Sequence, residues 1–244
     1  PKKSPYPKNH GGMLIIVSLM DFFPEYYLER EIPKSYISII NSMKKDSRLI
    51  NVCNLIQIAL APNFPESFST SVENFLRNNW PDDKSKLTSD YVFPIWFALR
   101  KFPRAFTCKD NNNNSLFPQL LDLIKNLISK TEDRTMTDLG SSLLMDFMKN
   151  LPNEFDNYAE KVAHVLLIHD YSENFIPTFK HIVFKNELVL KFVLRDIESL
   201  LTYLLDDNRE EKFIIFARLI ASLPSIPEKI VNKIKEPLLN LLNH

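Results

Sequence analysis

Glycine is scarce in this sequence: 3 of the 244 residues are glycine, against 16 that are proline. Nucleotide-binding α/β folds need glycine in their phosphate loops and in the tight turns that follow strands. The sequence has neither a Walker-type loop nor the glycine pattern of dinucleotide-binding proteins. We therefore expect no nucleotide cofactor, and no cofactor of another kind is indicated.

Cysteine is scarce as well. The two cysteines, Cys53 and Cys108, are too few for a disulfide framework. Cys53 lies within an apolar helical pattern. This usage is typical of reduced thiols, so we expect an intracellular protein, nuclear or cytoplasmic.

Long apolar runs and an excess of one charge are also missing. No apolar run approaches the ~18 residues of a membrane span, and no signal peptide is recognisable. Thirty basic residues balance thirty acidic ones, and the pI is about 7.4. Without a global electrostatic field, we expect no membrane partner, and nucleic acid is a less favoured partner than protein.

What the sequence does have is helical periodicity, which is clearest over residues 115–170. Within residues 116–128, and again within 136–151, apolar side chains recur at offsets of three and four, as on one face of an α-helix. The apolar fraction of 45% is ample for a core. Each such helix has a broad apolar face, so each must be covered by neighbours.

Prolines divide this periodicity into pairs of helices. First helices are expected to begin near residues 11, 46, 88, 134, 172 and 208. Most of them end at or near a proline, which lacks the amide proton and clashes with the preceding turn: Pro24, Pro62, Pro103, Pro152 and Pro224. Several second helices open with an apolar–proline pair: Ile32-Pro33, Phe64-Pro65, Phe117-Pro118 and Ile226-Pro227.

Some helix starts have capping signals. Asn153 is expected to cap a helix that runs on to Leu166 as one piece, and Ser225 with Glu228 has the spacing of a capping box. Gly140 lies on the apolar face of its helix, although glycine destabilises a helix by ~1 kcal/mol relative to alanine. Close approach of a neighbouring helix is the interpretation we favour for Gly140, over a functional role.

The repeated order of helix, proline turn, second helix and polar link resembles HEAT-type repeats, in about six degenerate copies over nearly the whole chain. The resemblance implies an all-α fold, namely an α-solenoid of about six HEAT-like helix pairs. We expect residues 1–10 to be a linker or leader. Residues 11–244 are expected to form a single α-solenoid domain, cut from a longer chain.

Catalytic and metal-binding motifs are not recognisable. His164 and His169 are five residues apart, so they point about 140° apart on a helix. There is no His-Glu-x-x-His spacing and no Gly-x-Ser-x-Gly elbow. The acidic pairs Asp82-Asp83 and Asp206-Asp207 lie in polar links, where helix stops and caps are the favoured interpretation. We expect no enzyme, no metal site and no small-molecule substrate.

Two edges of such a solenoid are candidate partner-binding surfaces. Basic residues gather in the links between repeats and would line up as a stripe: Lys44, Lys45, Arg48, Lys84, Lys86, Lys130 and Arg134. Such a stripe could meet phosphates or an acidic partner, although a solvated edge explains the same charges more simply. The opposite edge has aromatic and basic residues near the proline turns: Phe22, Phe23, Phe64, Arg100, Lys101 and Arg104. These rings are either exposed anchors for a partner or, as helical spacing favours, part of the core.

The leading hypothesis for function is a non-enzymatic protein–protein interaction scaffold, an α-solenoid subunit of a larger intracellular assembly of eukaryotic type. Its partner would be another protein or a peptide segment. One alternative is a tubulin-binding module similar to TOG domains, which have about six HEAT repeats in a chain of this length. Another is a nucleic-acid-binding helical repeat similar to MIF4G domains.

Overall fold

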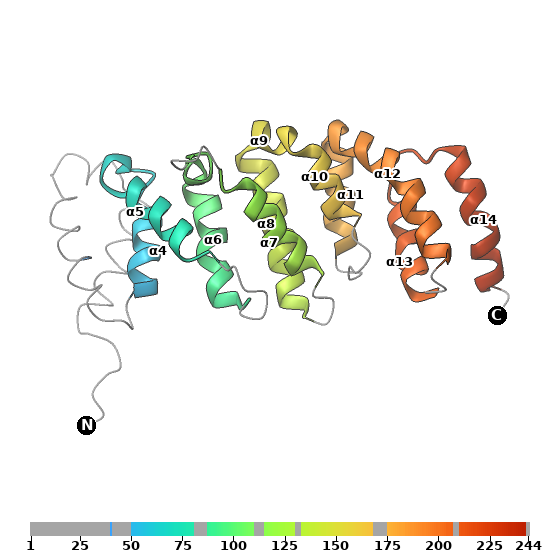
Figure 1. Ribbon diagram of the computed structural model, residues 1–244, viewed down its shortest axis with the longest axis horizontal. Helices are drawn as coiled ribbons and strands as arrows, with labels where there is room; N and C mark the ends of the chain where they lie inside the picture. Colours follow the sequence, from blue (N-terminus) through green and yellow to red (C-terminus); the bar gives the residue numbers. More distant parts are fainter. Residues whose placement is uncertain are drawn as a thin grey trace, which may run out of the picture. The chain divides into compact units, whose positions relative to one another are not determined.

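In the computed structural model the described residues are 40, 50–80, 87–109, 115–129, 133–167, 175–206 and 210–242. They form helices joined by turns and contain no strand, so the predicted all-α class is confirmed for them (Figure 1). The helices are α4 (Ile50–Leu60), α5 (Pro65–Asn78), α6 (Ser89–Lys101), the 3₁₀ helix η3 (Pro103–Phe106), α7 (Phe117–Ile128), α8 (Arg134–Asn150), α9 (Pro152–Asn157), α10 (Ala159–Leu166), α11 (Ile176–Lys185), α12 (Glu187–Asp206), α13 (Glu210–Ala221) and α14 (Glu228–Leu242).

The chain divides into two compact units, Pro1–Leu116 (unit 1) and Phe117–His244 (unit 2). Residues 1–10, which the sequence predicts to be a leader, lie outside the described residues, as does the first predicted helix pair apart from Ile40. The single solenoid domain over residues 11–244 stays a prediction.

Within the described residues, helices end or begin at prolines that the sequence analysis names, whereas Pro24 and Pro33 lie outside these residues. Phe64, Phe102 and Leu151 each precede a proline and share one non-helical backbone conformation, with φ of −132°, −139° and −138° and ψ of 59°, 63° and 59°. The amide of Leu151 donates to the Phe147 carbonyl at the end of α8, and its carbonyl accepts from Phe155 in α9. One residue thus closes one helix and opens the next, as steric repulsion from the following proline ring demands.

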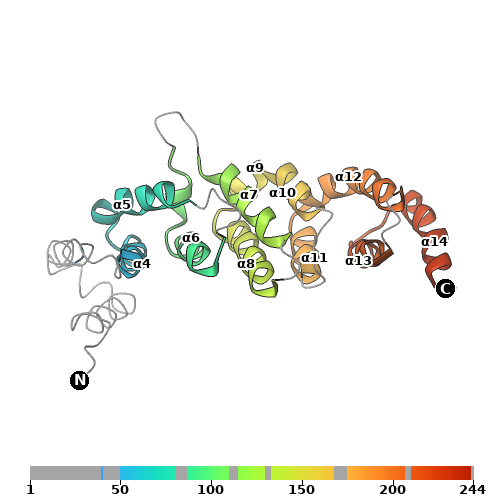
Figure 2. The ribbon, with the colours of Figure 1, turned by 60° about the horizontal axis from the view of Figure 1, so that its bottom comes forward.

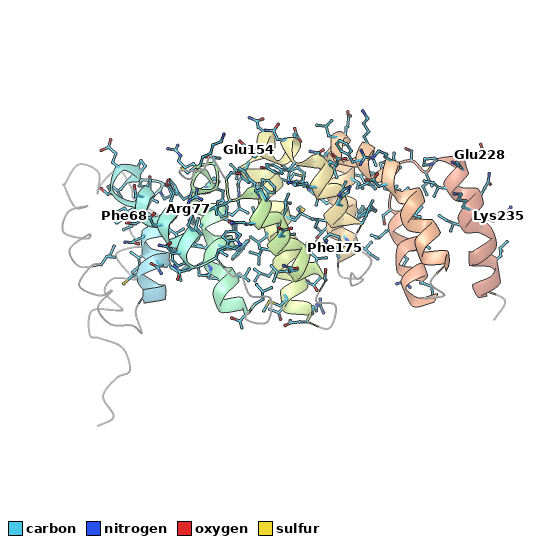
Figure 3. All side chains as sticks on the ribbon, in the orientation of Figure 1. Phe68, Arg77, Glu154, Phe175, Glu228 and Lys235 are labelled. Carbon is cyan, nitrogen blue, oxygen red and sulfur yellow. The ribbon has the colours of Figure 1, made fainter. Side chains whose placement is uncertain are left out.

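Unit 1 is built around α4, which packs against α5 and α6, while η3 lies against α5 and α6. The buried face of α5 consists of Phe68, Val72 and Leu76, and Phe68 is labelled in Figure 3. Cys53 is buried in α4, as its apolar pattern predicts, and its thiol donates weakly to the Ile40 carbonyl at 3.9 Å.

Unit 2 packs its helices in two rows (Figure 2). In one row α10 lies between α7 and α12, and in the other α11 lies between α8 and α13. Contacts of α7 with α8, of α11 with α12 and of α12 with α13 join the rows. The predicted first helices (α8, α11 and α13) therefore share one row, and the predicted second helices (α7, α10 and α12) share the other. Each of these helices packs on helices that are close to it in sequence.

An aromatic cluster joins α7, α8 and α9 in the core of unit 2. The ring of Phe147, which is fully buried, lies 5.4 Å from the Phe117 ring and 5.2 Å from the Phe155 ring, measured between centroids. The first pair is stacked at 15° and the second is edge-on at 70°. The Tyr158 ring extends the cluster, at 5.7 Å from Phe117. Such arrangements add to the stabilisation from burial alone.

Gly140 is buried where α8 meets α7, which bears out the close approach favoured from the sequence. A Cβ atom at this position would lie 2.9 Å from the Cβ of Leu127 and 3.1 Å from Cγ1 of Ile128. Glycine is needed here for space, because the two backbones come too close for a side chain between them.

Three predictions about helix continuity and helix caps are wrong. The helix predicted to run unbroken to Leu166 divides at Tyr158, whose amide is shared between the Glu154 and Phe155 carbonyls at 3.1 and 3.2 Å. Asn153 is not its cap, because the helix already begins at Pro152. Ser225 does not form a capping box, because α14 begins at Glu228, with the Pro227 carbonyl accepting its first amides.

Asn186 caps α12, a role that was not predicted from the sequence. Its Oδ1 accepts from the Val189 amide at 2.9 Å, and its Nδ2 donates to Oδ1 of Asp156 at 2.6 Å. The side chain thus satisfies an amide that the helix leaves unpaired, and it ties the start of α12 to α9.

We expect Asn186→Ala to lower the free energy of unfolding by about 1 to 2 kcal/mol, because the cap and the bridge to α9 are both lost. Asp156→Ala removes the bridge and leaves the cap, so its cost should be smaller. Urea unfolding followed by far-UV circular dichroism measures both variants. Equal costs for the two would contradict the capping role.

Candidate partner-binding surfaces

The predicted basic stripe falls almost entirely outside the described residues. Six of its seven members lie there: Lys44, Lys45, Arg48, Lys84, Lys86 and Lys130. The seventh, Arg134, is exposed in the first turn of α8 and pairs with Asp138 one turn later at 3.7 Å. An exposed pair at this spacing contributes little to stability. The stripe stays a prediction.

The alternative edge is partly described. Phe22 and Phe23 lie outside the described residues. Phe64 is not an exposed anchor: its side chain is only 7% exposed, and the residue forms the turn between α4 and α5. Its ring belongs to the core of unit 1, in line with the interpretation that helical spacing favours.

Arg100, Lys101 and Arg104 are brought together where α6 ends and η3 begins. The guanidinium of Arg100 lies over the Trp96 ring at 5.2 Å, and that of Arg104 lies near the Phe102 ring at 6.0 Å. Cations at this place also offset the negative end of the α6 dipole. The position of these charges therefore has a structural reason, independent of any partner.

The same helix, α6, has aromatic rings that are not fully buried in the core of unit 1. Phe93 is 42% exposed, and Trp96 and Phe97 are half-buried. The Phe93 ring lies 5.4 Å from the Trp96 ring and 6.1 Å from the Phe97 ring, the latter pair stacked at 11°. These rings and the three cations follow one another along α6 and the start of η3, and we call the six residues the aromatic–basic face: Phe93, Trp96, Phe97, Arg100, Lys101 and Arg104.

Phe93, Trp96 and Phe97 were not singled out from the sequence as surface residues. The buried residues are Val92, Ile95 and Leu99 among others. A signal was present, because residues 91–99 are apolar without interruption. A helix that is apolar all round has more apolar surface than one contact with the core can cover.

Unit 2 has a groove of about 640 Å³ at the ends of α8 and α11, bordered by the first turns of α9. It lies between the α8–α9 turn and the α11–α12 turn. Its lining consists of Met145, Asp146, Met148, Lys149, Pro152, Phe155, Asp156, His181, Lys185 and Asn186. Methionine side chains adapt to differently shaped ligands, which suits a groove of this kind to peptide binding.

An exposed apolar side chain lies next to this groove in sequence. Phe184, which precedes Lys185, is 53% exposed, and the ammonium group of Lys180 lies over its ring at 5.8 Å. Leu188, in the first turn of α12, is also exposed. Lysine side chains and acidic side chains both border the groove, so its charge favours neither an anionic nor a cationic ligand.

A cluster of charged side chains holds α10 against α12. The guanidinium of Arg195 donates to Glu160 at 2.8 Å and to both carboxylate oxygens of Asp196, at 2.6 and 2.9 Å. Nε2 of His164 lies 3.2 Å from Asp196. The Arg195 hydrogen bond lowers the pKa of Asp196, and the hydrogen bonds to Asp196 and then Glu160 raise the pKa of Arg195. This cluster bridges α10 and α12 at the surface, and its solvent exposure does not indicate a catalytic site.

Cys108 has a protected thiol. Its Sγ donates to Glu73 of α5 at 3.0 Å, and its carbonyl accepts from Arg77, also of α5, at 2.7 Å; Arg77 is labelled in Figure 3. Burial, the hydrogen bond to Glu73 and the charge of that carboxylate raise the pKa of the thiol to about 11, although Arg77 and Arg104 act to lower it. Since the thiolate is the nucleophile, a thiol with this pKa is not poised for catalysis.

We expect Cys108 to react with iodoacetamide at pH 8 about two orders of magnitude more slowly than an ordinary thiol, whose pKa is about 8.5. The rate should rise with pH up to about 11. Glu73→Gln removes the negative charge, so it should lower the midpoint and speed the reaction. Peptide-resolved mass spectrometry separates Cys108 from Cys53, and urea-unfolded protein gives the reference rate. A midpoint near 8.5 in the folded protein would contradict the assigned contact.

Within the ranges that the structure describes, no three or more His, Cys, Asp or Glu side chains are grouped as they would be around a metal ion. None of the helices described above combines the length and the apolar character that crossing a bilayer requires.

Comparison with known proteins gives no relative from which to infer the function. No protein-family model matches the chain, and no curated protein or solved structure matches it significantly.

Proposed function

We propose that the chain is a protein-interaction module of HEAT-type helix pairs, about six in number, that serves as a non-enzymatic subunit of a larger intracellular assembly. The observation that carries this proposal is the packing of unit 2. Two rows of helices, each helix contacting those close to it in sequence, are what stacked helix pairs produce. The recurrent turn at Phe64, Phe102 and Leu151 supports the same view.

Stacked helix pairs present a long surface in proportion to their core, and binding is what such a surface offers. Two features of the described surface suit protein partners. The aromatic–basic face combines Trp96 and Arg100, two residue types that dominate the energetics of protein interfaces. The groove between the turns of unit 2 has Met145, Met148 and Phe155 among its lining residues.

The test is affinity capture from cells with the whole chain as bait, followed by cross-linking mass spectrometry of the retained complexes. At least one protein should be retained in stoichiometric amount, and its cross-links should lie on one continuous surface of the chain. Three variants locate that surface. One reverses the charges of the predicted stripe, one reverses Arg100 and Arg104, and one reverses Lys149 and Lys185.

Loss of the partner in only one of the three variants identifies the surface that binds it. If only nucleic acid is retained, and nuclease treatment removes it, the interaction-module proposal is wrong. The same holds if nothing is retained above the level of the bare matrix. Far-UV circular dichroism of each variant checks that the helices are still formed.

A further inference from the structure

We draw no further inference here: the strongest candidate, the groove of about 310 Å³ between α13 and α14, is lined by apolar side chains and by Lys235, and nothing in the structure shows what covers it.

Discussion

Phe147→Ala is expected to lower the free energy of unfolding of unit 2 by about 3 to 5 kcal/mol. The Phe147 ring is fully buried and contacts the rings of Phe117 in α7 and Phe155 in α9. Truncation to alanine loses the transfer free energy of the Phe147 ring, opens a cavity and breaks two aromatic pairs. Three helices meet at this ring, so the cavity cannot close by the movement of one side chain.

The matched control is Phe184→Ala, which removes the same atoms from a side chain that is 53% exposed. Its cost should stay below about 1 kcal/mol, since little apolar surface returns to water. Urea unfolding followed by circular dichroism measures both variants. Both tryptophans lie in unit 1, so their fluorescence reports on that unit alone. A cost for Phe147→Ala no greater than that for Phe184→Ala would show that the cluster is not the core of unit 2.

Gly140→Ala is expected to destabilise the protein by about 1 to 3 kcal/mol, although alanine is the better helix former by ~1 kcal/mol. The new Cβ would lie 2.9 Å from Leu127 Cβ and 3.3 Å from the Ile128 amide nitrogen. Neither atom is the end of a flexible side chain. Relief requires α7 and α8 to move apart, which loosens the packing along their whole contact. Gly140→Val, with two more carbon atoms, should cost more.

Ser141→Ala is the control for Gly140→Ala, because it makes an alanine at the next position of the same helix. The hydroxyl of Ser141 is buried and, among the residues that the structure describes, has no hydrogen-bond partner. Removing it should leave stability unchanged or raise it by about 1 kcal/mol. Thermal and urea unfolding measure the pair. A stabilising Gly140→Ala would mean that the two helices are farther apart than the structure places them.

Much of the local structure could be predicted because its causes lie within a few residues. A proline affects only its neighbours and the turn before it, so Pro103 and Pro152 fix the ends of α6 and α8 whatever packs around them. The periodicity of residues 116–128 likewise predicts both a helix and its buried side. Gly140 could be interpreted for the same reason. Glycine destabilises a helix, so a glycine on the apolar face of a helix indicates that a neighbouring helix comes close to it.

The candidate site was harder to predict. Arg100, Lys101 and Arg104 were singled out from the sequence, but their neighbours Phe93 and Phe97 were not. An aromatic residue in an apolar run is assigned to the core by default. Whether it is exposed depends on how many helices cover that run, and the sequence does not give this number. For Phe64 the sequence left an exposed anchor and a core position open, with the core favoured; the structure places the ring in the core, because a ring at a turn is exposed or buried according to helices distant in sequence.

The sequence by itself determined three things: that the described chain is helical, where most of its helices begin and end, and that it lacks nucleotide-binding loops. Each of these follows from residues within a short window, namely from apolar periodicity, from proline positions and from the scarcity of glycine. Only the tertiary structure decided which apolar faces are covered, that Tyr158 divides a helix, that Asn186 bridges α9 and α12, and that Glu73 protects Cys108. These depend on contacts between residues about thirty positions apart or on the competing demands of several neighbouring helices. Such contacts follow from the way the helices pack together, and no local pattern encodes them.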